Sequence, residues 1–203
     1  MTWPGEEQAW DLLFEIDPDE VQRNANIMYD EELSIYGLIC FGQNIKVSLL
    51  DRNISGNSDT ADTLINELGD YSRLSILNYL VNVKNVPLSE QLVRPTDLSG
   101  GDLFARGTHI LPLDKIADLF NNDKDAFIKK GQELGGAQTE YGDMSLRLFP
   151  FPRVPIVLIV WSGDDEFPPR SSLLFDSSCT FHMPIDILWS TAMLTVKMMI
   201  HQD

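Results

Sequence analysis

The feature that most restricts the fold is an uninterrupted run of apolar residues, Val154–Trp161. A strand with one solvated face alternates apolar and polar residues, whereas a strand covered on both faces does not. The run therefore predicts a central, buried strand. Pro155 has no N–H group to donate to a neighbouring strand, so we expect it at the beginning of this strand or at a sheet edge.

The residues that follow predict a β-hairpin with an acidic connection. Residues 163–166 read Gly-Asp-Asp-Glu, and two prolines occupy positions 168 and 169. A second apolar run, Ser171–Phe175, then ends at Asp176. Glycine, aspartate and proline are typical turn residues. Two strands joined by an acidic, proline-stiffened connection are therefore expected.

Hydrophobic periodicity predicts the helices and strands of most of the remaining chain. The predicted helices span residues 5–15, 18–28, 62–84, 113–120, 125–134 and 184–200. The other predicted strands are a hairpin of residues 33–41 and 45–49, and a stretch of residues 137–149 that turns at Gly142 and Asp143. Residues 55–59 and 87–109 are expected to be loop and irregular structure. The pattern predicts a single α+β domain, with a mostly antiparallel sheet and helices packed on it.

The charge balance argues against two classes of partner. The 203 residues include 31 acidic and 15 basic side chains, which gives a net charge of -16. Such a chain repels the phosphates of nucleic acids and anionic membrane surfaces. The first residues lack the features of a secretory signal, and Cys40 and Cys179 are expected to be unpaired, reduced thiols. We therefore expect a cytoplasmic protein without a nucleic-acid or membrane partner.

Carboxylates around the predicted hairpin are the first candidates for a functional site. Carboxylate oxygens are ligands for Mg²⁺ and Ca²⁺, and a pair of carboxylates can act as general acid and base. The candidate residues are Asp143, Asp164, Asp165, Glu166, Arg170 and Asp176. The alternative is structural, since these residues also build turns, and Glu166 and Asp176 would then pair with Arg153 or Arg170.

Histidine and cysteine provide further candidates. His109 precedes an apolar segment and is a candidate for binding a ligand. Cys179 and His182 form a Cys-x-x-His sequence, which is half of a transition-metal site. The alternative for His182 is a histidine that faces solvent or is hydrogen bonded. The sequence contains no nucleophile elbow, Walker loop or dinucleotide-binding fingerprint.

A set of short motifs resembles an uncharacterised family. The motifs are HILPL at 109–113, LGG at 134–136, YGD at 141–143, PRVP at 152–155, WSGDDEFP at 161–168 and LFD at 174–176. They resemble the domain of unknown function 3786, a family of anaerobic bacteria and archaea, over nearly the whole chain. The resemblance implies the cytoplasm of an anaerobe and a link to metallocofactor or corrinoid metabolism. Some relatives carry cysteine-rich iron–sulfur segments, but two cysteines cannot ligate a four-cysteine cluster.

These observations lead to one functional hypothesis and two alternatives. We expect a protein that binds a small molecule or a metallocofactor, in a pocket lined by the His109 segment and the acidic hairpin. One alternative is an enzyme that uses Asp143, Asp165, Glu166 and Asp176 with a divalent cation. The other is a subunit that docks on a redox or methyl-transfer enzyme. Convergent carboxylates favour the enzyme, a deep apolar cavity with a histidine in its wall favours cofactor binding, and an exposed apolar patch favours docking.

Overall fold

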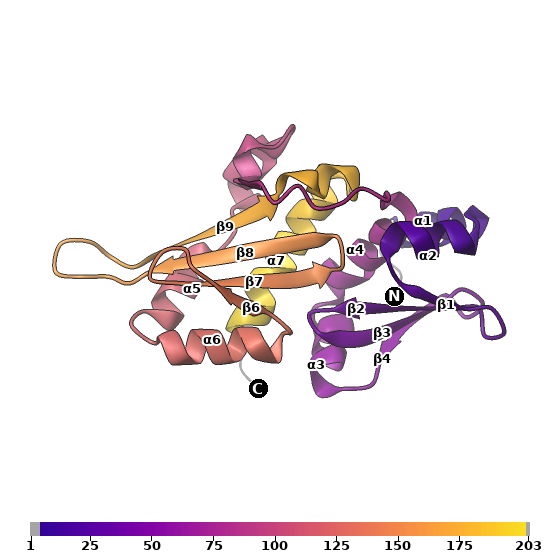
Figure 1. Ribbon diagram of the computed structural model, residues 1–203, viewed down its shortest axis with the longest axis horizontal. Helices are drawn as coiled ribbons and strands as arrows, with labels where there is room; N and C mark the ends of the chain where they lie inside the picture. Colours follow the sequence, from indigo (N-terminus) through magenta and orange to yellow (C-terminus); the bar gives the residue numbers. More distant parts are fainter. Residues whose placement is uncertain (1–4, 202–203) are drawn as a thin grey trace.

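The computed structural model describes residues 5–201 and confirms the α+β class. Two antiparallel sheets follow one another along the long axis of the molecule, as Figure 1 shows. The α-helices are α1 (Glu6–Glu15), α2 (Pro18–Ala25), α3 (Asp59–Asp62), α4 (Gly69–Asn82), α5 (Leu113–Phe120), α6 (Lys124–Glu133) and α7 (Ile185–Ile200). Within residues 5–201, every helix is too short or too polar to cross a membrane.

The N-terminal sheet is a meander in the order β1-β2-β3-β4. Its strands are β1 (Met28–Asp30), β2 (Ile35–Cys40), β3 (Gln43–Ser48) and β4 (Asn53–Gly56). The predicted hairpin is confirmed, because β2 and β3 pair from Ile35 to Cys40 around a tight turn. The prediction missed β1 and β4. In β4 only Ile54 is buried, so a strand of four residues shows too little alternation to be recognised.

The C-terminal sheet confirms the central position of the apolar run. Its strands are β5 (Leu92–Val93), β6 (Ala137–Thr139), β7 (Met144–Phe151), β8 (Val154–Trp161) and β9 (Arg170–Asp176), in the order β5-β9-β8-β7-β6. Pro155 lies at the beginning of β8, where the register with β7 shifts between Leu148 and Phe151. The missing N–H group therefore falls at an irregularity, as the sequence led us to expect.

The two faces of the C-terminal sheet have different environments. In register across β7, β8 and β9, Leu146, Leu158 and Leu173 are all buried on one face. Figure 1 shows α5 and α7 behind this sheet. The opposite face carries Arg147 and Val157, and the β6–β7 turn lies at its margin. The first face is therefore the core face. The second face is also covered along β8, where Val157 and Ile159 are at most 5% exposed.

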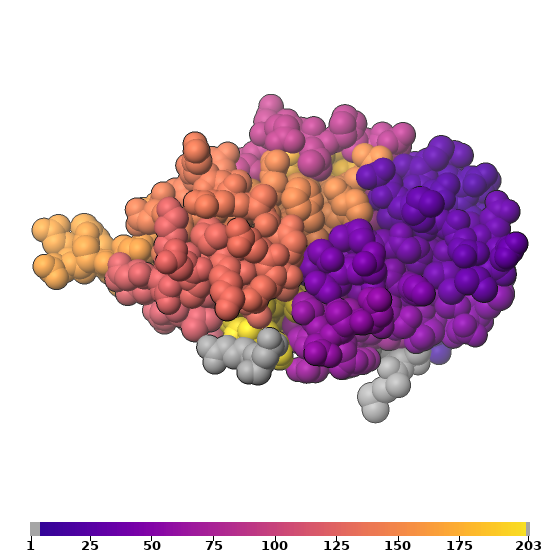
Figure 2. Space-filling view, turned by 60° about the horizontal axis from the view of Figure 1, so that its bottom comes forward, coloured from indigo at the N-terminus to yellow at the C-terminus, as the bar shows by residue number. Residues whose placement is uncertain are grey.

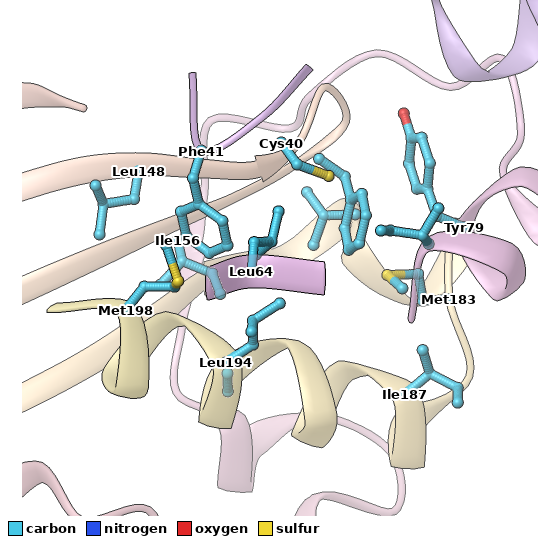
Figure 3. Close-up of a cluster of buried hydrophobic side chains, with 14 of the residues drawn as sticks. Cys40, Phe41, Leu64, Tyr79, Leu148, Ile156, Met183, Ile187, Leu194 and Met198 are labelled. Carbon is cyan, nitrogen blue, oxygen red and sulfur yellow. The ribbon is translucent and has the colours of Figure 1, made fainter. Parts of the chain in front are cut away.

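One hydrophobic core joins the two sheets. In Figure 3, Phe41 at the end of β2 lies with Ile156 of β8 above Leu194 of α7. The backbone N–H of Phe41 also donates to the carbonyl of Phe149, at the irregularity in β7, over 2.9 Å. The N- and C-terminal halves are thus held together by apolar packing and by a backbone hydrogen bond between the sheets.

Two predicted helices are shorter than expected. The helix predicted over residues 62–84 is interrupted, because residues 63–67 form a π-helical turn in which the N–H of Leu68 donates to the carbonyl of Thr63. A new helix, α4, then begins at Gly69. The helix predicted over residues 18–28 ends at Ala25, because Asn26 adopts a left-handed conformation (φ 56°) and Met28 begins β1.

Candidate functional site

The connection between β8 and β9, residues 162–169, projects from the body of the molecule. We call it the arm; it extends at the left of Figures 1 and 2. The Asp164 side chain accepts hydrogen bonds from the N–H groups of Glu166 and Phe167, both at 2.8 Å. The N–H of Asp164 donates to the carbonyl of Phe167 over 2.9 Å. With two prolines on the return, these bonds fix the shape of the arm.

Further hydrogen bonds fix the base of the arm. The N–H of Ser162 donates to the Asp143 carboxylate, and the N–H of Gly163 donates to the Asn121 side chain, each over 2.9 Å. The N–H donors to Asp164 lower the pKa of its carboxyl group, so this group is ionised at neutral pH. The arm is therefore held where it leaves β8 by Asp143 and Asn121 and at its tip by Asp164, whose side chains all accept backbone hydrogen bonds.

A groove of about 440 Å³ lies where the arm meets the sheet. The Arg170 guanidinium lies over the Trp161 ring, 4.6 Å from its centroid, and Phe167 is 67% exposed. The lining residues are Asp143, Trp161, Ser162, Asp164, Phe167, Pro168 and Arg170. The groove thus combines aromatic surface, one cationic side chain and two carboxylates.

The structure brings together part of the predicted acidic cluster. Asp143 and Asp164 line the groove with Arg170, whereas Asp165 and Glu166 are exposed on the arm. Within residues 5–201, no three side chains of His, Cys, Asp or Glu are arranged to hold a metal ion. The carboxylates of the arm therefore contribute charge to a surface, and they do not form a compact ligand set.

The double substitution Asp165→Asn/Glu166→Gln tests this interpretation. Both side chains are exposed, so we expect the melting temperature to stay close to that of the wild type. We expect Mg²⁺, Ca²⁺ or Mn²⁺ to leave the melting temperatures of both proteins unchanged. Thermal melting with and without each cation makes the comparison. A rise in wild-type melting temperature that the variant lacks would indicate a metal site on the arm.

Asp176 lies at the other end of β9 from Arg170, completely buried. Its carboxylate accepts hydrogen bonds from the N–H and hydroxyl groups of both Ser89 and Ser178, and from the N–H of Glu90. Burial alone would raise the pKa of Asp176, but these hydrogen bonds outweigh burial and lower the pKa to about 2. The carboxylate therefore anchors the segment before β5 to the end of β9.

The substitution Asp176→Asn is expected to remove about 2–3 kcal/mol of stability at neutral pH, the free energy that corresponds to lowering the pKa from 3.8 to about 2. A carboxyl group with a lowered pKa stabilises the fold above its unfolded-state pKa and loses this effect as the pH falls through the folded-state pKa. The wild type should therefore lose this stability between about pH 4 and pH 2.

Urea unfolding at several pH values measures this contribution, with Asp165→Asn as the control for an exposed aspartate. We expect the stability of Asp176→Asn to fall less steeply than that of the wild type over this acidic range. Parallel loss of stability in the wild type and Asp176→Asn would contradict the assigned role of the carboxylate.

The predicted arginine pairs are wrong. Arg153 donates to the carbonyls of Asn24 and Val86 and to the Asn85 side chain, so it joins the β7–β8 turn to the ends of α2 and α4. Arg170 lies on Trp161. The ion pairs of the described residues include neither arginine. Arg153 therefore binds mainly backbone carbonyls, and Arg170 binds an aromatic ring, instead of Glu166 or Asp176. Neither kind of partner can be recognised from charges in the sequence.

The histidine and cysteine candidates lie outside the groove. His182 is completely buried, and both of its ring nitrogens lack a hydrogen-bond partner among the described residues. Burial, assisted by the positive charge of Arg153, lowers the pKa of His182 to about 4. The His109 ring lies against Trp189, whose Nε1 donates to the His109 carbonyl over 2.6 Å. His109 therefore packs on α7 and does not meet the arm.

The two cysteines are free and buried, which confirms that they do not form a disulfide. Burial raises the pKa of both thiols, that of Cys179 to about 12. An iron–sulfur cluster is held by cysteine thiolates, usually four of them. Two protonated, buried thiols do not fit such a cluster.

Sequence reasoning missed the aromatic residues of the groove, Trp161 and Phe167. Trp161 was included in the buried strand, but it is the residue at which β8 leaves the core. Phe167 is an aromatic residue between acidic residues and two prolines. An apolar side chain inside a polar turn has no core to enter, and this signal could have identified it.

Comparison with known proteins supplies a family and no characterised relative. No curated protein and no solved structure matches the chain. The model of the family described as "Domain of unknown function (DUF3786)" matches residues 17–198, which include the arm, the groove and both sheets. The chain belongs to this family.

Proposed function

We propose that the protein is a non-catalytic binding protein that docks on a protein partner through the arm and the groove at its base. The observation that carries this proposal is the exposure of Phe167 on an arm whose shape is fixed by hydrogen bonds and prolines. A large apolar side chain on a preorganised projection loses little conformational entropy on binding. Such side chains commonly provide most of the binding energy of an interface.

The charges of the surface define the chemistry of the partner. Asp143 and Asp164 lie in the groove, Asp165 and Glu166 lie on the arm, and the whole chain has a net charge of -16. Arg170 is the cationic residue of the groove, and it is stacked on Trp161. Complementary charge directs encounter and excludes wrong partners. The partner therefore contacts the groove with a segment that contains lysine or arginine.

The two other hypotheses have less support. The enzyme hypothesis needs convergent carboxylates, and the described residues contain no such group of three. The cofactor hypothesis needs a histidine in the wall of a deep apolar cavity, and His109 packs on Trp189. In this proposal, the link to metallocofactor or corrinoid metabolism is a property of the partner, and this protein does not bind the cofactor itself. The family resemblance supports a redox or methyl-transfer enzyme of an anaerobe's cytoplasm in that role.

Photo-crosslinking at the arm tests the proposal. Benzoylphenylalanine replaces Phe167 in one protein and Phe181 in a matched control. Phe181 is also an exposed phenylalanine, at 59%, but it lies beyond the far end of β9. Crosslinking in the source cells is followed by mass spectrometry that identifies the crosslinked peptide. We expect one partner to crosslink from position 167 through a basic segment.

The control at position 181 tests whether crosslinking is specific to the arm, and the salt dependence tests whether charge contributes to binding. The same partner should not crosslink from position 181, and its yield from position 167 should fall as salt screens the charges. Equal crosslinking from both positions, or a crosslinked segment without basic residues, would overturn the proposed docking mode.

A further inference from the structure

A second exposed apolar surface lies on the outer face of the N-terminal sheet. Met28 is 75% exposed, Leu33 58% and Ile39 46%, although the inner face of the same strands is buried in the core. A hollow of about 430 Å³ is centred on this face. We call this surface the sheet patch. Its lining residues are Met28, Tyr29, Asp30, Leu33, Ile35, Gly37 and Lys46.

The strand register explains the hollow. Gly37 of β2 lies between Met28 of β1 and Lys46 of β3. A Cβ atom added at Gly37 would meet no other atom within 4 Å, so the space above this residue is open. The sheet patch therefore consists of a depression at Gly37 with an apolar side chain on one side and a lysine on the other.

The edge of β1 is closed to a further strand. The N–H of Tyr29 donates to the Gln22 side chain of α2 over 2.9 Å, which satisfies an edge group that strand addition would need. A partner of the sheet patch must therefore bind by side-chain packing on its face.

The charges of the sheet patch are arranged in a self-complementary way. Asp30 on β1 and Lys46 on β3 lie on opposite sides of β2, and Lys46 forms no ion pair within residues 5–201. A two-fold axis brings the same surface of two subunits together, so residue i of one copy faces residue j of the other. Asp30 is level with Ile35 and Lys46 is level with Gly37. With the axis crossing β2 near Tyr36, at right angles to the line from Asp30 to Lys46, Lys46 of each copy faces Asp30 of the other.

We propose that the sheet patch is the interface of a homodimer. Met28 of each copy packs into the depression at Gly37 of the other copy, and two Asp30–Lys46 pairs flank the apolar contact. Figure 1 shows β1 and the arm at opposite ends of the molecule. The proposed interface is therefore distant from the arm, and the inference does not depend on what the arm binds.

Charge reversal tests the pairing. The variants Asp30→Lys and Lys46→Asp each place like charges across the two-fold axis, and each should raise the dimer dissociation constant more than about tenfold. An equimolar mixture of the two variants should form a heterodimer about as stable as the wild-type dimer, because all four charges are then complementary. Sedimentation velocity over a concentration series measures the dissociation constants.

The matched control is Lys115→Asp on α5, which makes the same charge change at another exposed lysine. It should dimerise like the wild type. The Asp30 carboxylate also accepts a hydrogen bond from the N–H of Leu33 over 3.0 Å, so cooperative unfolding, rather than an unchanged melting temperature, would show that each variant folds. Met28→Asp provides a second variant, since Met28 is exposed and its replacement should abolish dimerisation. A wild type that is monomeric at millimolar concentration, or a dimer that Lys46→Asp and Lys115→Asp affect equally, would overturn the proposal.

Discussion

Replacement of Gly135 by alanine should destabilise the protein by about 2–5 kcal/mol, because two costs add. Gly135 ends α6 with a φ of +66°, a conformation that costs other residues roughly 1–2 kcal/mol. A Cβ atom at this position would also lie 2.7 Å from the Cα atom of Gly42, in the turn between β2 and β3. The nearest atoms are the Cα and the N of Gly42, and both belong to the backbone. The clash can therefore be relieved only by moving α6 away from the N-terminal sheet.

Gly107→Ala is the matched control, because Gly107 also has a positive φ, +54°, but a Cβ atom there would meet nothing within 4 Å. It should show the conformational cost alone, about 1–2 kcal/mol. Urea unfolding of both variants measures the difference. Equal destabilisation would show that the close contact between the two turns contributes nothing to the joining of the sheets.

Truncation of Leu158 to alanine is the second prediction with a large effect. Leu158 is completely buried on the core face of β8, in register with Leu146 and Leu173 of the neighbouring strands. Strands on both sides and helices behind the sheet prevent collapse around the vacated space. We therefore expect a loss of about 2–5 kcal/mol.

Val157→Ala is the control on the other face of the same strand. Val157 is 2% exposed, and with Arg147 it lines a separate hollow on the face opposite the shared core. Its truncation removes less apolar volume and opens toward solvent, so we expect a loss of about 1–2 kcal/mol. Denaturant unfolding compares the two variants. A loss for Val157→Ala as large as that for Leu158→Ala would contradict the assignment of the core face.

Long, strongly patterned elements could be predicted from the sequence. The apolar run of β8 has no alternation because the core face and the opposite face are both covered, and α5 matched its predicted bounds. The interrupted helix could not be predicted in the same way. The π-helical turn inserts one residue between two apolar segments, and both segments still reach the core. Tertiary packing selects this irregularity. The π-helical turn leaves the average spacing of the apolar residues almost unchanged, so the sequence pattern does not reveal it.

The candidate site was predicted in part, because charge was visible in the sequence and its partners were not. Asp143, Asp164 and Arg170 do meet in one groove, since the β6–β7 turn and the base of the arm lie at the same end of the sheet. Asp176 ends the same hairpin but lies at the other end of β9, where serine hydroxyls and backbone N–H groups surround it. Its distance from the arm follows from the length of β9, which agrees with the predicted run Ser171–Phe175 to within one residue at each end. The donors around Asp176 come from distant segments and could not be predicted.

The most direct test of the proposed function is the affinity of the crosslinked partner for three purified proteins: the wild type, Phe167→Ala and Phe181→Ala. Both phenylalanines are exposed, so both variants should melt like the wild type. We predict that Phe181→Ala binds the partner as the wild type does. Phe167→Ala should bind about 30-fold more weakly, the ratio that corresponds to loss of a binding hot spot of about 2 kcal/mol. Equal affinities of the two variants would contradict docking through the arm.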